Sequence, residues 1–225
     1  MNLVKSEDFF SPDLIPERIH IIGCGSVGGC VAELLARFGI TKMTLYDFDK
    51  VEDKNVVNQV FDYRHVGMDK VDALAQILRD INPSIGDELK LEHDGYVDQR
   101  LSGYVFLAVD DIEIRKSIVK KYRSNPNIIA MFDIRTELTS AQHYAANWAK
   151  YDDIKDLYAS MDFTKEEAEA ATPVSACGVV LGVAPTVRMV VNVAVVNLLN
   201  FVRSGKTELK RWAFVDAFGM SIDAF

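Results

Sequence analysis

A glycine-rich turn between a short apolar run and an amphipathic helix constrains this chain more than any other feature. Ile19–Ile22 has the composition of a buried strand, and Gly23, Gly25 and Gly28 follow it at G-x-G-x-x-G spacing. Apolar residues then recur at helical intervals up to Phe38, and a glycine ends the pattern. This order predicts a strand, a tight turn and a helix, the first half of a βαβ unit.

A second strand with an acid at its end completes the unit. Residues 43–46 are suited to a strand, and Asp47 follows 19 residues after Gly28. In such a unit the glycines permit a tight turn and a close phosphate, the helix N-terminus offers free N–H groups, and the acid accepts ribose hydroxyls. The segment therefore predicts a nucleotide site. The alternative is a tight turn of an α/β domain that binds no ligand.

Strand and helix patterns alternate through the rest of the chain. Helices are expected at 70–81, 112–122 and about 187–202, and strands at 89–92, 104–109, 128–134, 141–148, 212–216 and 221–225. The alternation predicts an α/β fold with a Rossmann-like, doubly wound, mostly parallel sheet and C-terminal antiparallel strands. We expect one domain over 1–225, with an irregular lead-in at 1–17 and a crossover-like segment at 149–176.

Composition narrows the classes of partner. The 225 residues carry a formal charge of −8, which argues against a general nucleic-acid or membrane-surface binder. The apolar stretch 174–202 contains a proline, an arginine and three asparagines, so a buried helix or a dimer contact is favoured over a membrane span. The three cysteines form no C-x-x-C pair, and the first residues contain no signal-peptide core. A cytoplasmic location is the expectation.

Polar groups from separate segments are expected to meet at one edge of the sheet. Ligands of open α/β sheets bind beyond the carboxyl ends of the strands. The glycine turn, Asp47 and Asp110 each follow a predicted strand. The polar connection 50–67 is long, as functional loops often are.

Four ordered motifs resemble the ThiF/MoeB/E1 superfamily, whose members activate ubiquitin-like and sulfur-carrier proteins with ATP. They are GCGSVG with LYDFDKVEDKN, then VGMDKVDALAQILRDINP, then VFLAVDDIEIRK, and finally CGVVLGVAPTVRMVVNVAVVNLLNFVRSG with WAFVDAFG. Together they extend over nearly the whole chain from Arg18 onward, in the family's order.

The resemblance implies a role for each matching residue. Asp47 would hold the ribose of ATP, Lys70 would neutralise charge on the triphosphate, and Asp110 would hold Mg²⁺. Asn55 would meet the phosphate region. The remaining cofactor-binding positions implied in this way are Gly23, Gly25, Ser26, Gly28, Asp49 and Asn58.

The same resemblance implies the reaction and the partners. A carboxylate at the C-terminus of a small ubiquitin-like protein, sulfur-carrier protein or peptide would attack the α-phosphorus, giving an acyl-adenylate and pyrophosphate. Such a step depends on well-placed cations and an in-line geometry. A homodimer is implied, with a heterodimer as the variant.

The chain departs from the family pattern where arginines are usual. Asn58 stands where the family has an arginine, and the family's N-terminal arginine motif and zinc cysteine pairs are absent. Lys54 and Arg64 lie in the same loop region, and Arg64 is the candidate replacement. The alternatives are a catalytically impaired docking subunit or heterodimer half and, from the glycine turn and Asp47 alone, an NAD-dependent oxidoreductase.

Several residues carry two readings. Asp110 or Asp111 is suited to cap the helix that follows, and Lys70 is a surface residue if the resemblance is set aside. Arg135 lies near where relatives carry a substrate-facing arginine. Cys177 resembles a reactive position in some relatives, although a buried, unreactive cysteine is the favoured reading.

Overall fold

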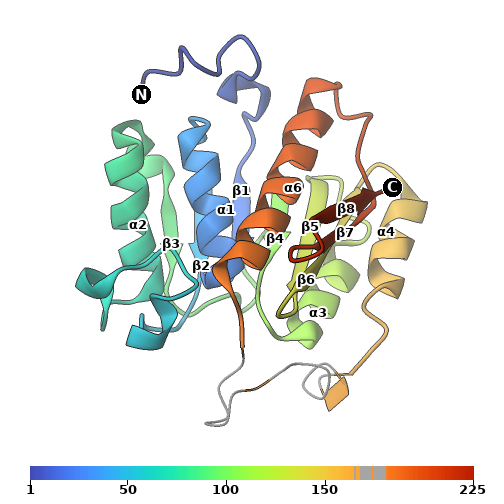
Figure 1. Cartoon of the computed structure of the whole chain (residues 1–225). Helices are drawn as coiled ribbons and strands as arrows, with labels where there is room; N and C mark the ends of the chain where they lie inside the picture. The colour runs from blue at the N-terminus through green and yellow to red at the C-terminus, as the bar shows by residue number, and fades with distance from the viewer. Residues whose placement is uncertain (165, 168–173, 175–180) are drawn as a thin grey trace.

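An eight-stranded sheet with helices on both faces forms the body of the protein (Figure 1). The computed structural model describes residues 1–164, 166–167, 174 and 181–225. The strand order is β3-β2-β1-β4-β5-β6-β7-β8. The strands are β1 (Ile19–Ile22), β2 (Met43–Tyr46), β3 (Lys90–Glu92), β4 (Gly103–Leu107), β5 (Ile128–Thr136), β6 (Ser140–Asn147), β7 (Trp212–Asp216) and β8 (Ser221–Ala224). The predicted doubly wound, mostly parallel sheet with antiparallel C-terminal strands is confirmed.

The five strands β3, β2, β1, β4 and β5 run parallel, so their carboxyl ends share one edge. Ile22, the last residue of β1, pairs with Tyr46 of β2 on one side and with Leu107 of β4 on the other. Each of these three strands is buried along its whole length, as the continuous apolar runs predicted. The segments that follow Ile22, Tyr46 and Leu107 therefore emerge side by side.

Helices cover the two faces of the sheet because alternate strand residues point in opposite directions. Ile21 belongs to the core beneath α1 (Ser26–Arg37), α2 (Lys70–Ile81) and α6 (Ala184–Arg203), whereas Ile22 belongs to the core beneath α3 (Ile112–Tyr122) and α4 (Tyr151–Ala159). The helix pairs α1 with α6 and α1 with α2 pack side by side. The chain thus buries one sheet between two helical layers.

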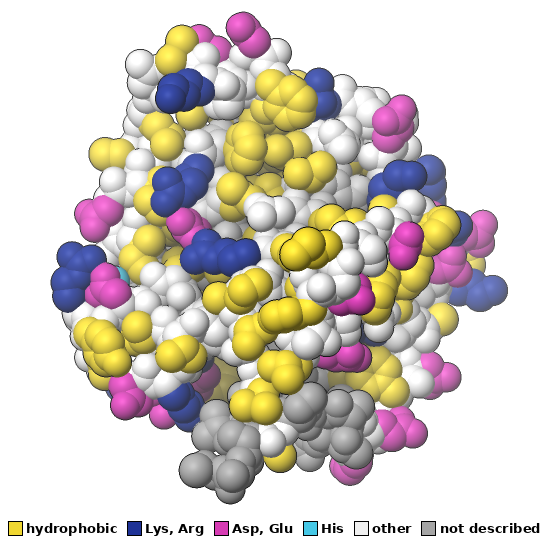
Figure 2. Space-filling view, viewed as in Figure 1, with side chains coloured by type: hydrophobic (Ala, Val, Ile, Leu, Met, Phe, Trp, Pro, Cys, Tyr) yellow, Lys and Arg dark blue, Asp and Glu magenta, His cyan; other side chains and the backbone are white. Residues whose placement is uncertain are grey.

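The antiparallel strands leave one end of the sheet open. All four residues of β8 are exposed, and β8 pairs only with β7 among the described strands. Hydrophobic side chains lie over this end of the molecule in Figure 2. The exposed ones near β8 are Phe218, Met220, Ile222 and Phe225.

The lead-in 1–17 contains no α-helix or strand, as expected, but it is held against the domain. Phe10 is buried and contacts Phe38 edge-to-face at 5.7 Å between ring centroids. Ile15 is also buried, directly after a 3₁₀ turn over Pro12–Leu14. The lead-in therefore contributes to the same core as α1.

By length and composition, helix α6 could cross a membrane, and it is the only such helix among the described residues. Its most apolar window is 61% buried inside the protein. The buried core helix of a soluble protein meets the same criteria, and the contacts of α6 with α1 and with strands β5, β6 and β7 account for its composition.

The crossover-like segment 149–176 begins with a helix, α4, that the sequence analysis did not anticipate. Farther along, Thr164 and Glu167 form a capping box: the Thr164 N–H donates to Glu167 Oε2 at 2.7 Å, and the Glu167 N–H donates to Thr164 Oγ1 at 3.2 Å. The prediction for Cys177 lies outside the described residues.

Candidate functional site

Gly23 and Gly28 are required by close packing at the end of β1. Gly23 has φ +93°, and a Cβ there would lie 2.8 Å from the carbonyl oxygen of Ala108, just beyond β4. A Cβ on Gly28 would lie 1.8 Å from the carbonyl oxygen of Gly23. The turn can therefore press α1 against β1 only with glycine at both positions.

Gly25 instead leaves the start of α1 open. The nearest heavy atom to a Cβ on Gly25 is the Gln59 amide nitrogen, 4.0 Å away. No side chain caps α1 at Gly25, and the first N–H to bond back within the helix is that of Gly29. The N–H groups from Ser26 onward are therefore suited to an anion.

Gln59, which the sequence analysis passed over, faces this turn. Its Oε1 is buried and has no hydrogen-bond partner in the part of the chain that the structure describes. A buried, unsatisfied amide oxygen is unusual in a folded protein and is consistent with a ligand donor. The signal in the sequence was weak, because a single glutamine in a polar loop has many readings.

Asp47 joins the glycine turn to the segment after β2. The Cys24 N–H donates to Asp47 Oδ2 at 2.7 Å, and the Asp49 N–H donates to Asp47 Oδ1 at 2.9 Å. Each carboxylate oxygen retains a further acceptor site. The residue is half-buried and fixed at the edge where a ribose is expected.

Lys70 points into the protein rather than into solvent. It is the first residue of α2, and its side chain is 10% exposed. Its ammonium lies 2.7 Å from Asp49 Oδ2, and its N–H donates to the Asp49 carbonyl oxygen at 2.9 Å. The reading of Lys70 as a solvated surface residue is therefore wrong.

Asp110 and Asp111 have separate roles. Asp111 caps α3, because its Oδ1 accepts from the Glu113 N–H at 2.8 Å and from the Ile114 N–H at 3.4 Å. The exposed carboxylate of Asp110 makes no hydrogen bond or ion pair with any described residue. It stands two residues beyond Ala108, beside the glycine turn, with its oxygens available to a hard cation.

The loop residues form hydrogen bonds and ion pairs with other residues of the protein. Asn55 Oδ1 accepts from the Glu52 N–H at 2.9 Å, and Asn58 Nδ2 donates to the Gly182 carbonyl oxygen at 3.4 Å. The Lys54 ammonium lies 3.0 Å from Glu52. The Arg64 guanidinium lies 2.6 Å from Asp62, and its side chain is 84% exposed; hydrogen bonding from Arg64 lowers the pKa of Asp62 to about 2. A cation-replacing role for Arg64 stays a prediction.

A buried carboxylate at the end of β5 organises two arginines. Asp133 is fully buried and accepts from Arg115 of α3 and from Arg135 Nε, the latter at 2.7 Å. Arg135 also donates to the Ser160 carbonyl oxygen at 2.7 Å, which ties β5 to the end of α4. The guanidinium of Arg135 is thus held by the protein itself.

The two described cysteines near the turn are not reactive thiols. Cys24 and Cys30 are both buried. Burial raises the pKa of Cys24, and it raises the pKa of Cys30 to about 11. Both therefore act as packing residues.

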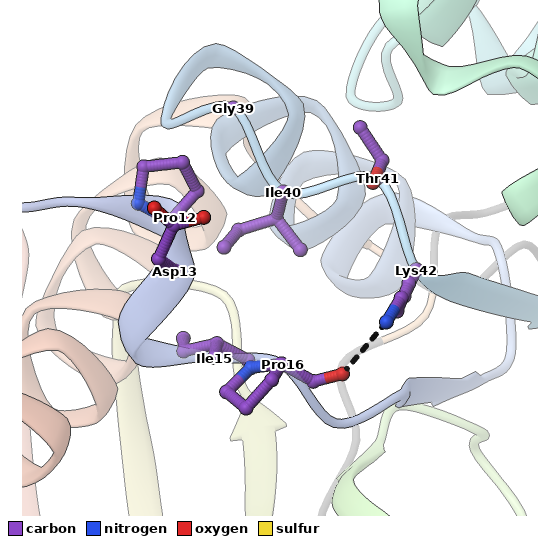
Figure 3. Close-up of a pocket in the computed structure, with 8 residues that line it drawn as sticks. All are labelled: Pro12, Asp13, Ile15, Pro16, Gly39, Ile40, Thr41 and Lys42. Carbon is purple, nitrogen blue, oxygen red and sulfur yellow. Dashed lines mark hydrogen bonds between the residues drawn. The ribbon is translucent and has the colours of Figure 1, made fainter.

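A cavity of about 380 Å³ lies away from these groups, between the lead-in and the connection from α1 to β2 (Figure 3). Its lining includes Ile15, Pro16, Ile40 and Lys42, and the Lys42 ammonium donates to the Pro16 carbonyl oxygen at 3.1 Å. These residues precede β1 and β2, so the cavity is at the amino edge of the sheet. None of the predicted site residues lines it.

Hydrogen bonds and an ion pair thus link most of the predicted site at the carboxyl edge. They run from the glycine turn through Asp47 and Asp49 to Lys70, with Asp110 adjacent beyond β4. The ThiF family model matches residues 11–225, nearly the whole chain. The chain belongs to the ThiF family.

Ubiquitin-like modifier-activating enzyme 5 from several organisms is similar in sequence to part of this chain. Ubiquitin-like modifier-activating enzyme 5 of Bombyx mori is 43% identical over 69 residues, 31% of this chain and 18% of the relative. The Rattus norvegicus enzyme is 35% identical over 116 residues, 44% of this chain and 29% of the relative. The matched segments span less than a third of either curated relative.

Among solved structures, Escherichia coli MccB with ATP has a TM-score of 0.68 and 18% identity. The match covers 95% of this chain and 64% of that one. MccB has also been solved in complex with N-formylated MccA. The likeness to MccB establishes the Rossmann-like fold.

Proposed function

We propose that this chain is an E1-like adenylyltransferase that uses ATP and Mg²⁺. Its substrate is the C-terminal carboxylate of a small ubiquitin-like protein, sulfur-carrier protein or peptide. A carboxylate oxygen bonds to the α-phosphorus, and the bond from that phosphorus to the bridging oxygen of the β-phosphate breaks. Pyrophosphate leaves with the electron pair, and the acyl-adenylate remains.

One observation carries the proposal: an open helix N-terminus, a fixed aspartate, an inward lysine and an unpaired aspartate meet at one sheet edge. The N–H groups after Gly25 suit phosphate oxygens, and Asp47 suits ribose hydroxyls. Lys70 offers a positive charge in a partly desolvated place, where electrostatic stabilisation is strong.

Asp110 fits a magnesium ligand, because its carboxylate has no partner among the described residues while Asp111 caps α3. A bound Mg²⁺ would supply charge neutralisation on the phosphates. The protein's own part is to fix the nucleotide: the glycine turn orients the phosphates, Asp47 orients the ribose, and Lys70 stabilises the charge that develops as pyrophosphate departs.

The partners follow from the same relatives. The relatives' name, ubiquitin-like modifier-activating enzyme 5, and the MccB complex with MccA support a small protein or peptide as the acceptor. A homodimer or a heterodimer, with α6 as a contributor, and a cytoplasmic location complete the proposal. An NAD-dependent oxidoreductase is disfavoured, because a dinucleotide needs neither the inward Lys70 nor the free Asp110.

ATP–pyrophosphate exchange in the presence of candidate carrier proteins tests the proposal. Wild type should exchange pyrophosphate only with Mg²⁺ and a carrier. Lys70→Met should lower the exchange rate roughly a hundredfold, since it removes one stabilising cation. Lys50→Met is the matched control: Lys50 is a 63% exposed lysine of the same loop region, and its loss should leave exchange unchanged. Equal rates for both variants would contradict the proposal.

The second candidate is a docking subunit or heterodimer half with impaired catalysis. The contact that favours it is that of Asn58, whose amide bonds to Gly182 and supplies no positive charge. The nearby cations Lys54 and Arg64 are paired with Glu52 and Asp62. Absence of exchange with every carrier, alone and with a partner subunit, would favour this candidate.

A further inference from the structure

Two ion pairs join the segment after β2 to the start of α2, and the lysine belongs to a different segment in each pair. Lys50 and Asp69 form an antiparallel bridge, with their charged atoms 2.7 Å apart. One residue along each segment, Asp49 and Lys70 form the second pair, also at 2.7 Å. The two short segments are thus joined by two neighbouring lysine–aspartate ion pairs.

The two pairs differ in burial. The outer lysine, Lys50, has a side chain 63% exposed, whereas the side chain of Lys70 is 10% exposed. An unpaired ammonium that is largely removed from water costs several kcal/mol. Lys70 therefore depends on its partner to remain in place, and Asp49 is its only ion-pair partner among the described residues.

Asp49 is itself fixed by the nucleotide-binding edge. Its N–H donates to Asp47 Oδ1, and its carbonyl oxygen accepts from the Lys70 N–H. The glycine turn, Asp47, Asp49 and Lys70 therefore form one connected series of hydrogen bonds. The Asp49 side chain is 52% exposed, so its carboxylate can be hydrated once the lysine turns to another anion.

We propose that Asp49 is a positioning residue: it holds the Lys70 ammonium aimed at the sheet edge before nucleotide arrives, and it acts through Lys70 rather than by binding the nucleotide. This inference rests on the proposed function for the identity of the incoming anion, a triphosphate. The holding of Lys70 itself is a property of the free protein.

The first experiment uses nucleotide-free protein and an amine-acylating reagent, with Lys70 modification followed by mass spectrometry. Burial and the ion pair with Asp49 keep the Lys70 side chain from the reagent, so this lysine should react slowly. Asp49→Asn should raise the rate at Lys70 about tenfold or more, because loss of the carboxylate charge frees the lysine side chain from its ion pair. Asp69→Asn, the control at the outer pair, should leave the rate at Lys70 unchanged. An unchanged rate in Asp49→Asn overturns the proposal whether or not the protein is an enzyme.

The second experiment separates positioning from nucleotide binding by steady-state exchange. Asp49→Asn should lower kcat about tenfold or more, while KM for ATP changes less than about threefold. Asp49→Glu, which restores the charge on a half-exposed side chain, should recover most of kcat. A large rise in KM with kcat intact would make Asp49 a direct ligand and overturn the proposal. No exchange by wild type would instead refute the proposed function, and the acylation result would still decide whether Asp49 holds Lys70.

Discussion

Two adjacent aspartates after β4 are expected to respond differently to substitution. Asp111→Ala should lower the free energy of unfolding by about 1 kcal/mol, since it removes the cap of α3. Asp110→Ala should leave the stability unchanged but abolish Mg²⁺-dependent exchange. Urea denaturation and exchange assays on both variants test this. If Asp110→Ala retains Mg²⁺-dependent exchange, Asp110 is not a ligand of the metal.

Buried histidines should make the protein acid-sensitive. His143 is fully buried, its Nε2 lies 3.0 Å from Asn197 Nδ2, and burial lowers its pKa from 6.5 to about 4. The unfolded chain therefore binds a proton that the folded state resists, so the free energy of unfolding should fall as pH drops from 6.5 towards 4. His20, whose pKa burial also lowers to about 4, adds to the same trend.

The matching measurement is urea denaturation of wild type and His143→Gln at neutral and mildly acidic pH. The variant should lose less stability on acidification than wild type, whatever its stability at neutral pH. Parallel losses in the two proteins would show that His143 does not drive the acid response.

For single residues, the sequence indicated a role in the site where a suitable residue type directly follows a predicted strand. The position of Asp47 at the carboxyl edge could be predicted because it follows a strand, whereas the inward position of Lys70 was implied only by the family resemblance. Asp133 could not be predicted as the partner of two arginines, because that network joins three separate elements, α3, β5 and α4, whose packing no single sequence pattern reveals. The ion pair of Lys70 with Asp49 was equally hidden, since spacing alone does not reveal which way a side chain turns.

Among the elements, the turn between β1 and α1 offers a matched pair of substitutions. Gly28→Ala should destabilise the protein severely, because its Cβ would overlap the Gly23 carbonyl oxygen. Gly25→Ala should fold almost normally, since it meets nothing closer than 4.0 Å, yet it should weaken nucleotide binding by narrowing the approach to the helix N-terminus. Melting temperature and nucleotide titration distinguish the two effects, and equal stability of both variants would contradict this packing.

Most regular elements with strong periodicity were predicted to within a residue or two, although α6 begins at Ala184, three residues before the expected start. The helix α4 was missed because four acidic or lysine residues in Tyr151–Ala159 mask its apolar positions. Ile154, Leu157 and Met161 are nevertheless buried against the same face of the sheet as α3. Their spacing was helical, but burial against a sheet cannot be read from so short a pattern.

For the whole molecule, the question is whether the carboxyl edge of the sheet carries enough positive charge to support the proposed adenylation. Asn58→Arg would place a guanidinium where the family resemblance implies one, although the amide contact with Gly182 is lost. If the missing charge limits catalysis, exchange should rise by roughly a hundredfold. If a partner subunit supplies the charge, the variant should be no faster than the assembled wild type. A slower variant, with unchanged melting temperature, would show that Asn58 itself has a role.

The overall topology could be predicted because it follows from order: apolar runs alternate with helical patterns, and parallel strands bring their carboxyl ends together. Two features could not be predicted in this way: β8 is left without a second partner among the described strands, and the lead-in is attached through the contact of Phe10 with Phe38.

Calorimetric titration of the protein with ATP and with NAD, each with and without Mg²⁺, tests most directly the claim that this sheet edge is an ATP·Mg²⁺ site. We predict that ATP binds, that Mg²⁺ strengthens its binding in wild type but not in Asp110→Ala, and that NAD binds far more weakly or not at all. Tight binding of NAD together with no heat from ATP would contradict the account.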